Sequence, residues 1–234
     1  MSTSNFELFW ITAALLLLSY SIYDSHRSAK LSRHLLFFIC GGSLFWQEFY
    51  ADWGAFLIWN TDFHMMPWGK TLWTIENKPW FNIAAYPVFM WAAFTCISAF
   101  LSRVKCADRP LQLLIVCAMV AGPTLYGFNV VTEYLAVAKA GLWTYTDTIG
   151  PALRTEAGTM PLLYPGIPFA MFAVLLAFLQ HYRNAKGQLH IEEVFSKKNL
   201  NDRPIAKVFC WILVWNSCYW LALCTPLILI RNFS

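Results

Sequence analysis

Three acidic side chains lie inside apolar, aromatic stretches of this sequence, where a charge is costly. Glu48 and Asp52 are four residues apart, a spacing that places both carboxyl groups on one face of a helix. Glu133 has a similar setting later in the chain, with Asn129 one helical turn before it. Burial favours the protonated form of a carboxyl group, and a neighbouring carboxyl group strengthens that preference. The pattern predicts neutral carboxylic acids that protonate an alkene or an epoxide oxygen and then accept the proton back.

Aromatic residues gather around the same acids, and ring faces stabilise cations. Half of the tryptophans fall in the 35 residues from Trp46 to Trp80. An aromatic belt at the membrane interface, with solvated acids beside it, is the alternative explanation. A belt would populate both ends of the helices, whereas the opposite ends here contain few Trp and Tyr residues. The residues expected to line a substrate cavity are Trp46, Trp53, Trp59, Asn129, Trp143 and Tyr145.

The elements that would position these residues are membrane helices. Hydrophobic residues make up 58% of the 234 residues and charged residues only 13%, against about 25% in an ordinary globular chain. Stretches long and apolar enough to cross about 30 Å of hydrocarbon as helices predict six spans. They are residues 6–23, 35–55, 81–101, 111–135, 162–181 and 207–230. We therefore expect an all-α integral membrane protein, with residues 1–234 forming one polytopic domain.

The charges of the connections predict the orientation. The connections 24–34, 102–110 and 181–207 are basic, whereas 60–80 and 139–161 are balanced. Six spans place the basic connections on one side, which the positive-inside rule assigns to the cytoplasm. Both termini would then be non-cytoplasmic, and in a eukaryote the membrane would be that of the endoplasmic reticulum. The alternative of seven spans requires a turn near Gly122-Pro123.

Two stretches of the chain resemble each other. Glu48 is followed by Leu57-Ile-Trp59-Asn-Thr-Asp62, and Glu133 is followed by Leu142-Trp143-Thr-Tyr-Thr-Asp147. Each stretch leads to an apolar helix that contains proline. The pattern is typical of a parallel internal repeat, and chance similarity between two aromatic membrane segments is the alternative.

The sequence lacks the motifs typical of nucleotide-, metal- and nucleic-acid-binding proteins. No nucleotide-binding glycine motif, paired C-x-x-C or set of metal ligands is present, so we expect neither a cofactor nor a metal. His64 and Asp62 are close together, but the loop supplies no third and fourth metal ligand. The basic residues are spread over short connections rather than one patch, which argues against nucleic acid as a partner.

Two motifs carry a family resemblance. Phe45-Trp-Gln-Glu48-Phe-Tyr50 resembles the acid-bearing segment of the fungal membrane-bound meroterpenoid cyclases. Gly141-Leu-Trp143-Thr-Tyr145, after Glu133, is similar to a segment of small lycopene-cyclase-type membrane domains. The resemblance implies cyclisation of a prenylated substrate through a cation. The fungal cyclases have seven spans and a second acid in the last helix, where this chain has no acid and only Asn216 as a strongly polar side chain.

The sequence therefore predicts a cofactor-free cyclase or isomerase, acting in the membrane on a lipophilic isoprenoid or meroterpenoid. Glu48 is the favoured acid, and Glu133 or Asp52 is its partner. Membrane lipid and a lipophilic small molecule are the expected partners, beside enzymes of the same pathway such as a prenyltransferase and an epoxidising monooxygenase. The alternative is a non-enzymatic carrier or lipid-binding protein whose acids bind a proton or an amine. A carrier would need polar residues towards both sides of the membrane, and this chain has them mainly on one side.

Overall fold

The computed structural model describes residues 2–67, 71–75, 77–196 and 200–234, and it places a helix in each of the six apolar stretches. Four helices are long and apolar enough to cross a membrane: α1 with its continuous length Thr3–Arg27, α4 at Asn82–Leu101, and the longer stretches Pro110–Lys139 and Pro204–Phe233. The apolar helix α6, Gly166–His181, is shorter. The predicted helical class is confirmed, while the count of six spans stays a prediction.

Capping serines and first-turn prolines mark the start of several of these helices. The Ser2 side chain accepts a hydrogen bond from the backbone N–H of Asn5 and caps α1. Ser32 caps α2, Arg33–Gly42, in the same way. Pro110 and Pro204 stand in the first turns of α5 and α8, where their missing N–H costs no hydrogen bond.

The stretch 35–55 is not one straight helix. It is divided into α2, the 3-10 helix η1 at Phe45–Gln47, and α3 at Glu48–Gly54. Side chains near the division bind the last long helix: Gln47 Nε2 donates to Asn216 Oδ1 at 2.6 Å, and Asn216 Nδ2 donates to Ser43 Oγ at 2.8 Å. The buried Gln47 side chain requires a partner, and the interrupted helix brings it to the half-buried Asn216. Glu48 consequently begins a short separate helix.

The other interruptions are π-helical and leave the helices continuous. α5, Pro110–Glu133, passes through Pro123 and continues into the π-helix η2, Tyr134–Lys139. The turn near Gly122-Pro123 that seven spans require is therefore absent, and that alternative is wrong at this position. The last long helix consists of α8 (Pro204–Tyr219), the π-helix η4 (Trp220–Cys224) and α9 (Thr225–Phe233).

The connections contain two small sheets, which an all-α prediction did not include. β1, Leu57–Trp59, pairs antiparallel with β2, Trp143–Tyr145, and Trp59 lies opposite Trp143. These strands are the two similar stretches of the sequence, so the structure pairs them directly. β3, Ala152–Arg154, pairs with β4, Thr159–Pro161. Pairing satisfies backbone groups that an irregular connection in an apolar setting would leave unbonded.

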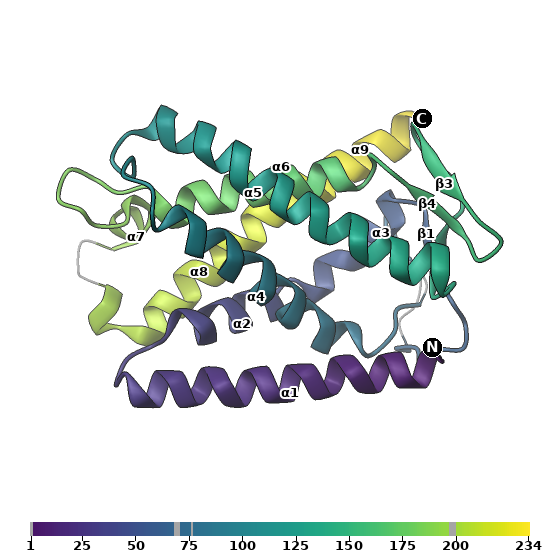
Figure 1. The fold of residues 1–234 in the computed structure, drawn as a ribbon, viewed down its shortest axis with the longest axis horizontal. Coiled ribbons are helices and arrows are strands. Elements are labelled where there is room, and N and C mark those ends of the chain that lie inside the picture. Colours follow the sequence, from purple (N-terminus) through teal and green to yellow (C-terminus); the bar gives the residue numbers. More distant parts are fainter. Residues whose placement is uncertain (1, 68–70, 76, 197–199) are drawn as a thin grey trace.

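Figure 1 shows how the connections are divided between the two ends of the bundle. The three basic connections, including the short helices α7 (His190–Phe195) and η3 (Leu200–Asp202), lie at the left-hand end. Both chain termini and the strands lie towards the right-hand end. Lys197 and Lys198 of the third basic connection, like Trp68 of the tryptophan-rich stretch, are outside the described residues.

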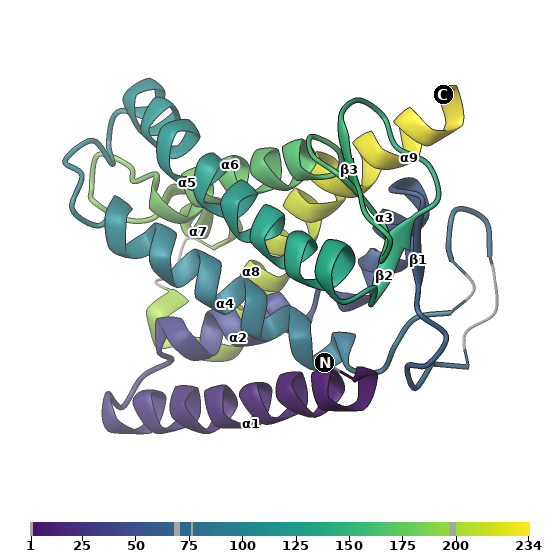
Figure 2. The same ribbon diagram turned by 45° about the vertical axis from the view of Figure 1, so that its right-hand side comes forward.

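The centre of the bundle is aromatic, whereas α1 is peripheral. Phe94, Phe172 and Trp215 are fully buried and contact one another, with centroid distances of 4.7 to 6.5 Å. In Figure 2, α1 runs along the lower edge of the molecule, against α2 and α4. Only 11% of its most apolar window is buried. Its large apolar side chains are therefore available to lipid or to a partner.

Candidate functional site

A cavity of about 610 Å³ lies at the strand-bearing end of the bundle. Its walls come from the first turns of α1, from α3 and α4, from the end of α5 with η2, and from the strands β1 and β2. Most of the lining side chains are apolar. The structure brings seven of the nine expected site residues to this cavity: Glu48, Asp52, Trp59, Asn129, Glu133, Trp143 and Tyr145.

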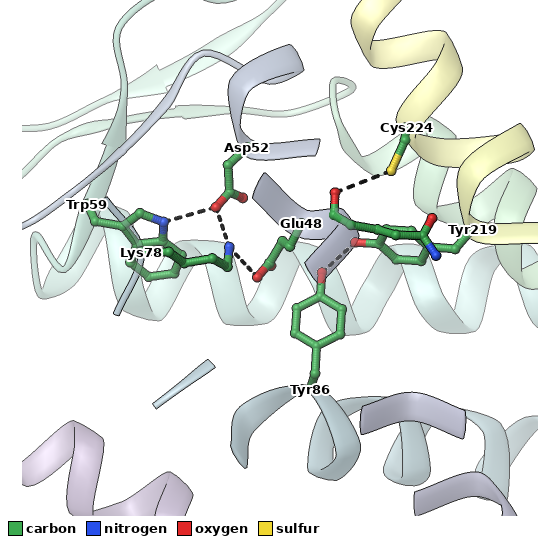
Figure 3. Close-up of polar contacts among 8 residues, drawn as sticks. Glu48, Asp52, Trp59, Lys78, Tyr86, Tyr219 and Cys224 are labelled. Atoms are coloured by element: carbon green, nitrogen blue, oxygen red, sulfur yellow. Dashed lines mark hydrogen bonds and ion pairs between the residues drawn. The ribbon is translucent and has the colours of Figure 1, made fainter. Parts of the chain in front are cut away.

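Glu48 and Asp52 share one buried ammonium group, that of Lys78 (Figure 3). Lys78 Nζ lies 2.5 Å from Glu48 Oε2 and 2.5 Å from Asp52 Oδ2. The Lys78 side chain is 0% exposed. Trp59 Nε1 donates a second hydrogen bond to Asp52 Oδ2, at 3.0 Å. The helical spacing of Glu48 and Asp52 thus places both carboxyl groups on one face, as the sequence predicted. The Lys78 ammonium group bridges them.

Lys78 is not among the site residues predicted from the sequence, because the connection 60–80 has the balanced charge of a polar loop. The backbone of this loop is held in place, since the Met66 N–H donates to the Lys78 carbonyl at 2.8 Å. The ammonium group also lies 5.3 Å from the ring centroid of Trp59 and 5.6 Å from that of Phe49. A lysine directly before Pro79-Trp80, at the start of an apolar helix on the side of the acids, was the available signal.

The carboxyl group of Glu133 is stabilised by neutral side chains instead of a cation. Trp143 Nε1 donates to Glu133 Oε2 at 2.9 Å, and the Tyr145 hydroxyl also interacts with this carboxyl group. Within the described part of the chain, no ion pair includes Glu133. Burial, followed by the neighbouring Glu133, raises the pKa of Tyr145 well above its ordinary value of 10. Tyr145 is therefore a neutral hydroxyl at any physiological pH.

The strand pair β1–β2 links the two carboxyl centres. Trp59 and Trp143 lie opposite each other, with ring centroids 4.8 Å apart and planes tilted by 54°. Each indole N–H donates to a different acid, Trp59 to Asp52 and Trp143 to Glu133. The rings therefore form one wall of the cavity while their nitrogen atoms hold the carboxyl groups on either side.

Two expected cavity residues lie elsewhere. Trp46 is 44% exposed; its Nε1 donates to Asn216 Oδ1, and its ring stacks with that of Trp220. Trp53 lines a separate cavity and contacts the Arg231 guanidinium, 4.2 Å from its ring centroid. The expectation that these tryptophans line the same cavity is therefore corrected. Trp46 precedes the change of direction into α3, and Trp53 lies on another face of that short helix.

Two tyrosines that were not predicted as site residues also line the cavity. The hydroxyl groups of Tyr86, from α4, and Tyr219, from α8, are hydrogen-bonded to each other (Figure 3). Tyr86 also interacts with Glu48. The last long helix thus contributes a hydroxyl group where the family resemblance implied an acid.

The fold and the site define a helical protein with a largely apolar cavity that is lined by three carboxyl groups, two of which are paired with the buried Lys78. The chain belongs to the AveC-like spirocyclase family, whose model matches residues 28–234. No curated protein and no solved structure matches the chain. The expectation of a cyclase is confirmed at the level of a cyclase-type family, which favours the enzymatic interpretation over a carrier.

Proposed function

We propose that this protein is a membrane-embedded, cofactor-free cyclase that closes a ring in a lipophilic substrate by proton transfer from a buried carboxylic acid. The supporting observation is the position of Glu48, Asp52 and Glu133 around one apolar cavity. A cavity of about 610 Å³ has the size of ordinary small-molecule sites, which span roughly 300–1,000 Å³.

The charge balance suggests the proton donor. Glu48 and Asp52 are bridged by Lys78, so an ionised carboxylate there has a cation at 2.5 Å. Among the described residues, Glu133 has the neutral partners Trp143 and Tyr145 and is in no ion pair. A buried carboxylate without a cation costs several kcal/mol more than a paired one. We therefore assign Glu133 as the proton donor, in place of the initially favoured Glu48, and the pair Glu48–Asp52 as the group that accepts a proton at the end.

The reaction follows from this division. Glu133 transfers its proton to an epoxide oxygen or an alkene, which leaves a cationic carbon on the substrate. An alkene or a hydroxyl group of the same molecule attacks that carbon and closes the ring. The carboxylate pair accepts the proton that is then lost, so the product is an isomer of the substrate. The faces of Trp59, Trp143 and Phe81 stabilise the cation, because the cavity offers it little water.

Two substrate classes fit this chemistry. The acid-and-aromatic pattern favours an isoprenoid or meroterpenoid with an epoxide or alkene. The description of the family as spirocyclases favours a product in which two rings share one atom. A keto-diol gives such a product when acid promotes loss of water from its cyclic hemiketal and the second hydroxyl group closes on the same carbon. Both routes need one buried proton donor and one acceptor.

The activity is tested with the purified protein in lipid nanodiscs. One probe is a farnesylated phenol with a terminal epoxide, and the other is a long-chain keto-diol. Mass spectrometry distinguishes the results, because the epoxide gives a cyclic isomer of equal mass and the keto-diol loses one water. Product from either probe with the wild type, and none with Glu133→Gln, is expected. Equal product from both proteins would overturn the proposal.

We also propose that the basic connections face the cytoplasm and that both termini lie on the opposite side. Asp147 and Lys186 are exposed and belong to connections at opposite ends of the bundle. In a background with exposed Cys96 replaced by serine, Lys186→Cys should react with an impermeant thiol reagent only from the cytoplasmic side. Asp147→Cys should react only from the other side. Labelling of both from one side would contradict this topology.

A further inference from the structure

Asn82 is a buried polar residue whose side-chain nitrogen has no hydrogen-bond partner among the described residues. It is the first residue of α4, it is 3% exposed, and it lines the cavity that contains the three acids. Its Nδ2 is buried without a hydrogen-bond partner. A buried polar group left unpaired costs about 1–3 kcal/mol, so an amide in such a position requires an explanation.

Trp10 of α1 has the same property. Its ring lines the cavity, and its Nε1 is buried without a partner. The ring of Phe6 contacts both Trp10, with centroids 6.0 Å apart, and Phe81, at 5.1 Å. Phe81 directly precedes Asn82, so Trp10 and Asn82 belong to segments of α1 and α4 that pack against each other and line the same cavity.

The tryptophans of the carboxyl centres show the contrast. Trp59 and Trp143 line the same cavity, and their indole N–H groups are bonded to Asp52 and Glu133. Among the described residues that line the cavity, the unpaired donors come from α1 and α4. Ser98, further along α4, also has a buried hydroxyl without a partner, but it does not line the cavity.

We propose that Asn82 and Trp10 form a second polar subsite, which binds an oxygen atom of the lipophilic ligand and orients that ligand towards the carboxyl groups. Nitrogen donors select an acceptor, so the ligand group is a carbonyl, hydroxyl or ether oxygen. Rotation of the Asn82 side-chain amide by a half-turn exchanges its oxygen and its nitrogen. This residue can therefore donate a hydrogen bond to a hydroxyl group or accept one from it. The identity of the ligand as the substrate rests on the proposed function.

The subsite would determine specificity as well as affinity. The match to the family begins at residue 28, so Asn82 lies within the matched region and Trp10 lies before it. A site built to pair with an oxygen rejects an analogue that lacks one, because its own donors are then left unbonded. The helix α1 thus contributes recognition, while α3 and α5 contribute the acids.

Binding is tested with geranylacetone and with the hydrocarbon that lacks its carbonyl oxygen. The rise in the thermal unfolding midpoint of the protein in nanodiscs is measured for each probe. The wild type should be stabilised more by the ketone. Asn82→Leu and Trp10→Phe should bind the ketone at least tenfold more weakly and should lose the preference, whereas Ser98→Ala should retain it. An unchanged preference in both Asn82→Leu and Trp10→Phe would overturn the proposal.

A second measurement separates recognition from a structural role. Without ligand, Asn82→Leu removes an unpaired polar group and fills similar space, so its unfolding midpoint should equal or exceed that of the wild type. A large drop would show that the amide supports the fold and would contradict the subsite. Glu133→Gln should still prefer the ketone. If that variant also retains full activity, the proposed function fails while the subsite stands.

Discussion

Two carboxyl centres face the same cavity and are stabilised in opposite ways. At the first, Glu48 and Asp52 share the ammonium group of Lys78, which is buried between them. At the second, the partners that the described part of the chain gives Glu133 are the neutral side chains of Trp143 and Tyr145. The paired strands β1 and β2 supply one tryptophan to each centre, so the local framework is alike and the cation is the difference. We therefore expect the centre that contains Lys78 to accept a proton and the Glu133 centre to donate one.

The largest effect is expected at the centre without a cation. Glu133→Gln keeps the shape of the side chain and removes its proton, so activity should fall by about 10²–10⁴, the usual contribution of a positioned acid or base. Product formation by the purified variant measures the loss. Glu156→Gln, at an exposed position, is the matched control and should retain activity. A larger loss in Glu48→Gln than in Glu133→Gln would reverse the assignment of donor and acceptor.

The next effect concerns the centre with the cation. Lys78→Met preserves the apolar length of the side chain but leaves Glu48 and Asp52 without their counter-charge, which should cost about 3–5 kcal/mol of stability. Thermal and denaturant unfolding in nanodiscs measure the change. Adding Asp52→Asn removes one of the unpaired charges and should recover part of the loss. If the double variant is no more stable than Lys78→Met, the ion pairs with Lys78 are not the main source of stability at this centre.

The two tryptophans give a smaller and more selective test. Trp143→Phe and Trp59→Phe each keep a ring and remove one N–H donor to a carboxyl group, a change of about 1–3 kcal/mol. We expect Trp143→Phe to reduce the maximal rate, because it releases the proton donor. Trp59→Phe should act mainly on stability, because Lys78 still holds Asp52. The same change in rate for both variants would remove the distinction between the centres.

The smallest effect is expected for Tyr145 and concerns the stability of the folded protein at alkaline pH. Burial, followed by Glu133, raises the pKa of Tyr145 in the folded protein, so the folded state holds this proton more tightly than the unfolded state does. Stability from the neutral hydroxyl is complete below about pH 10 and decreases as the pH rises above it. Tyr145→Phe should therefore lower stability by about 0.5–1.5 kcal/mol at pH 7 and weaken the alkaline decline. A decline that is identical in both proteins would place the titrating group elsewhere.

Some features were predicted correctly from the sequence because they depend on composition and on periodicity. The apolar stretches predicted where helices form, and the spacing of Glu48 and Asp52 predicted a shared face. The similar stretches that follow Glu48 and Glu133 contain the strands β1 and β2, which pair with each other, while the internal repeat stays a prediction. Membership in a cyclase-type family agrees with the chemistry expected of buried acids.

Other features depended on contacts between distant segments. The sequence could not show that Lys78 enters the bundle, because a lysine in a connection is normally solvated and only the facing carboxylates make its burial stable. It also could not separate Trp59, which lines the cavity, from Trp46 and Trp53, which do not. Their direction depends on the interrupted helix at Ser43–Gln47, and this interruption is stabilised by Asn216 from the far end of the chain. Composition and spacing determined which residues could do chemistry. Tertiary packing decided which of them share a cavity and which of them are paired with a cation, because charge and direction are set by neighbours that are distant in the sequence.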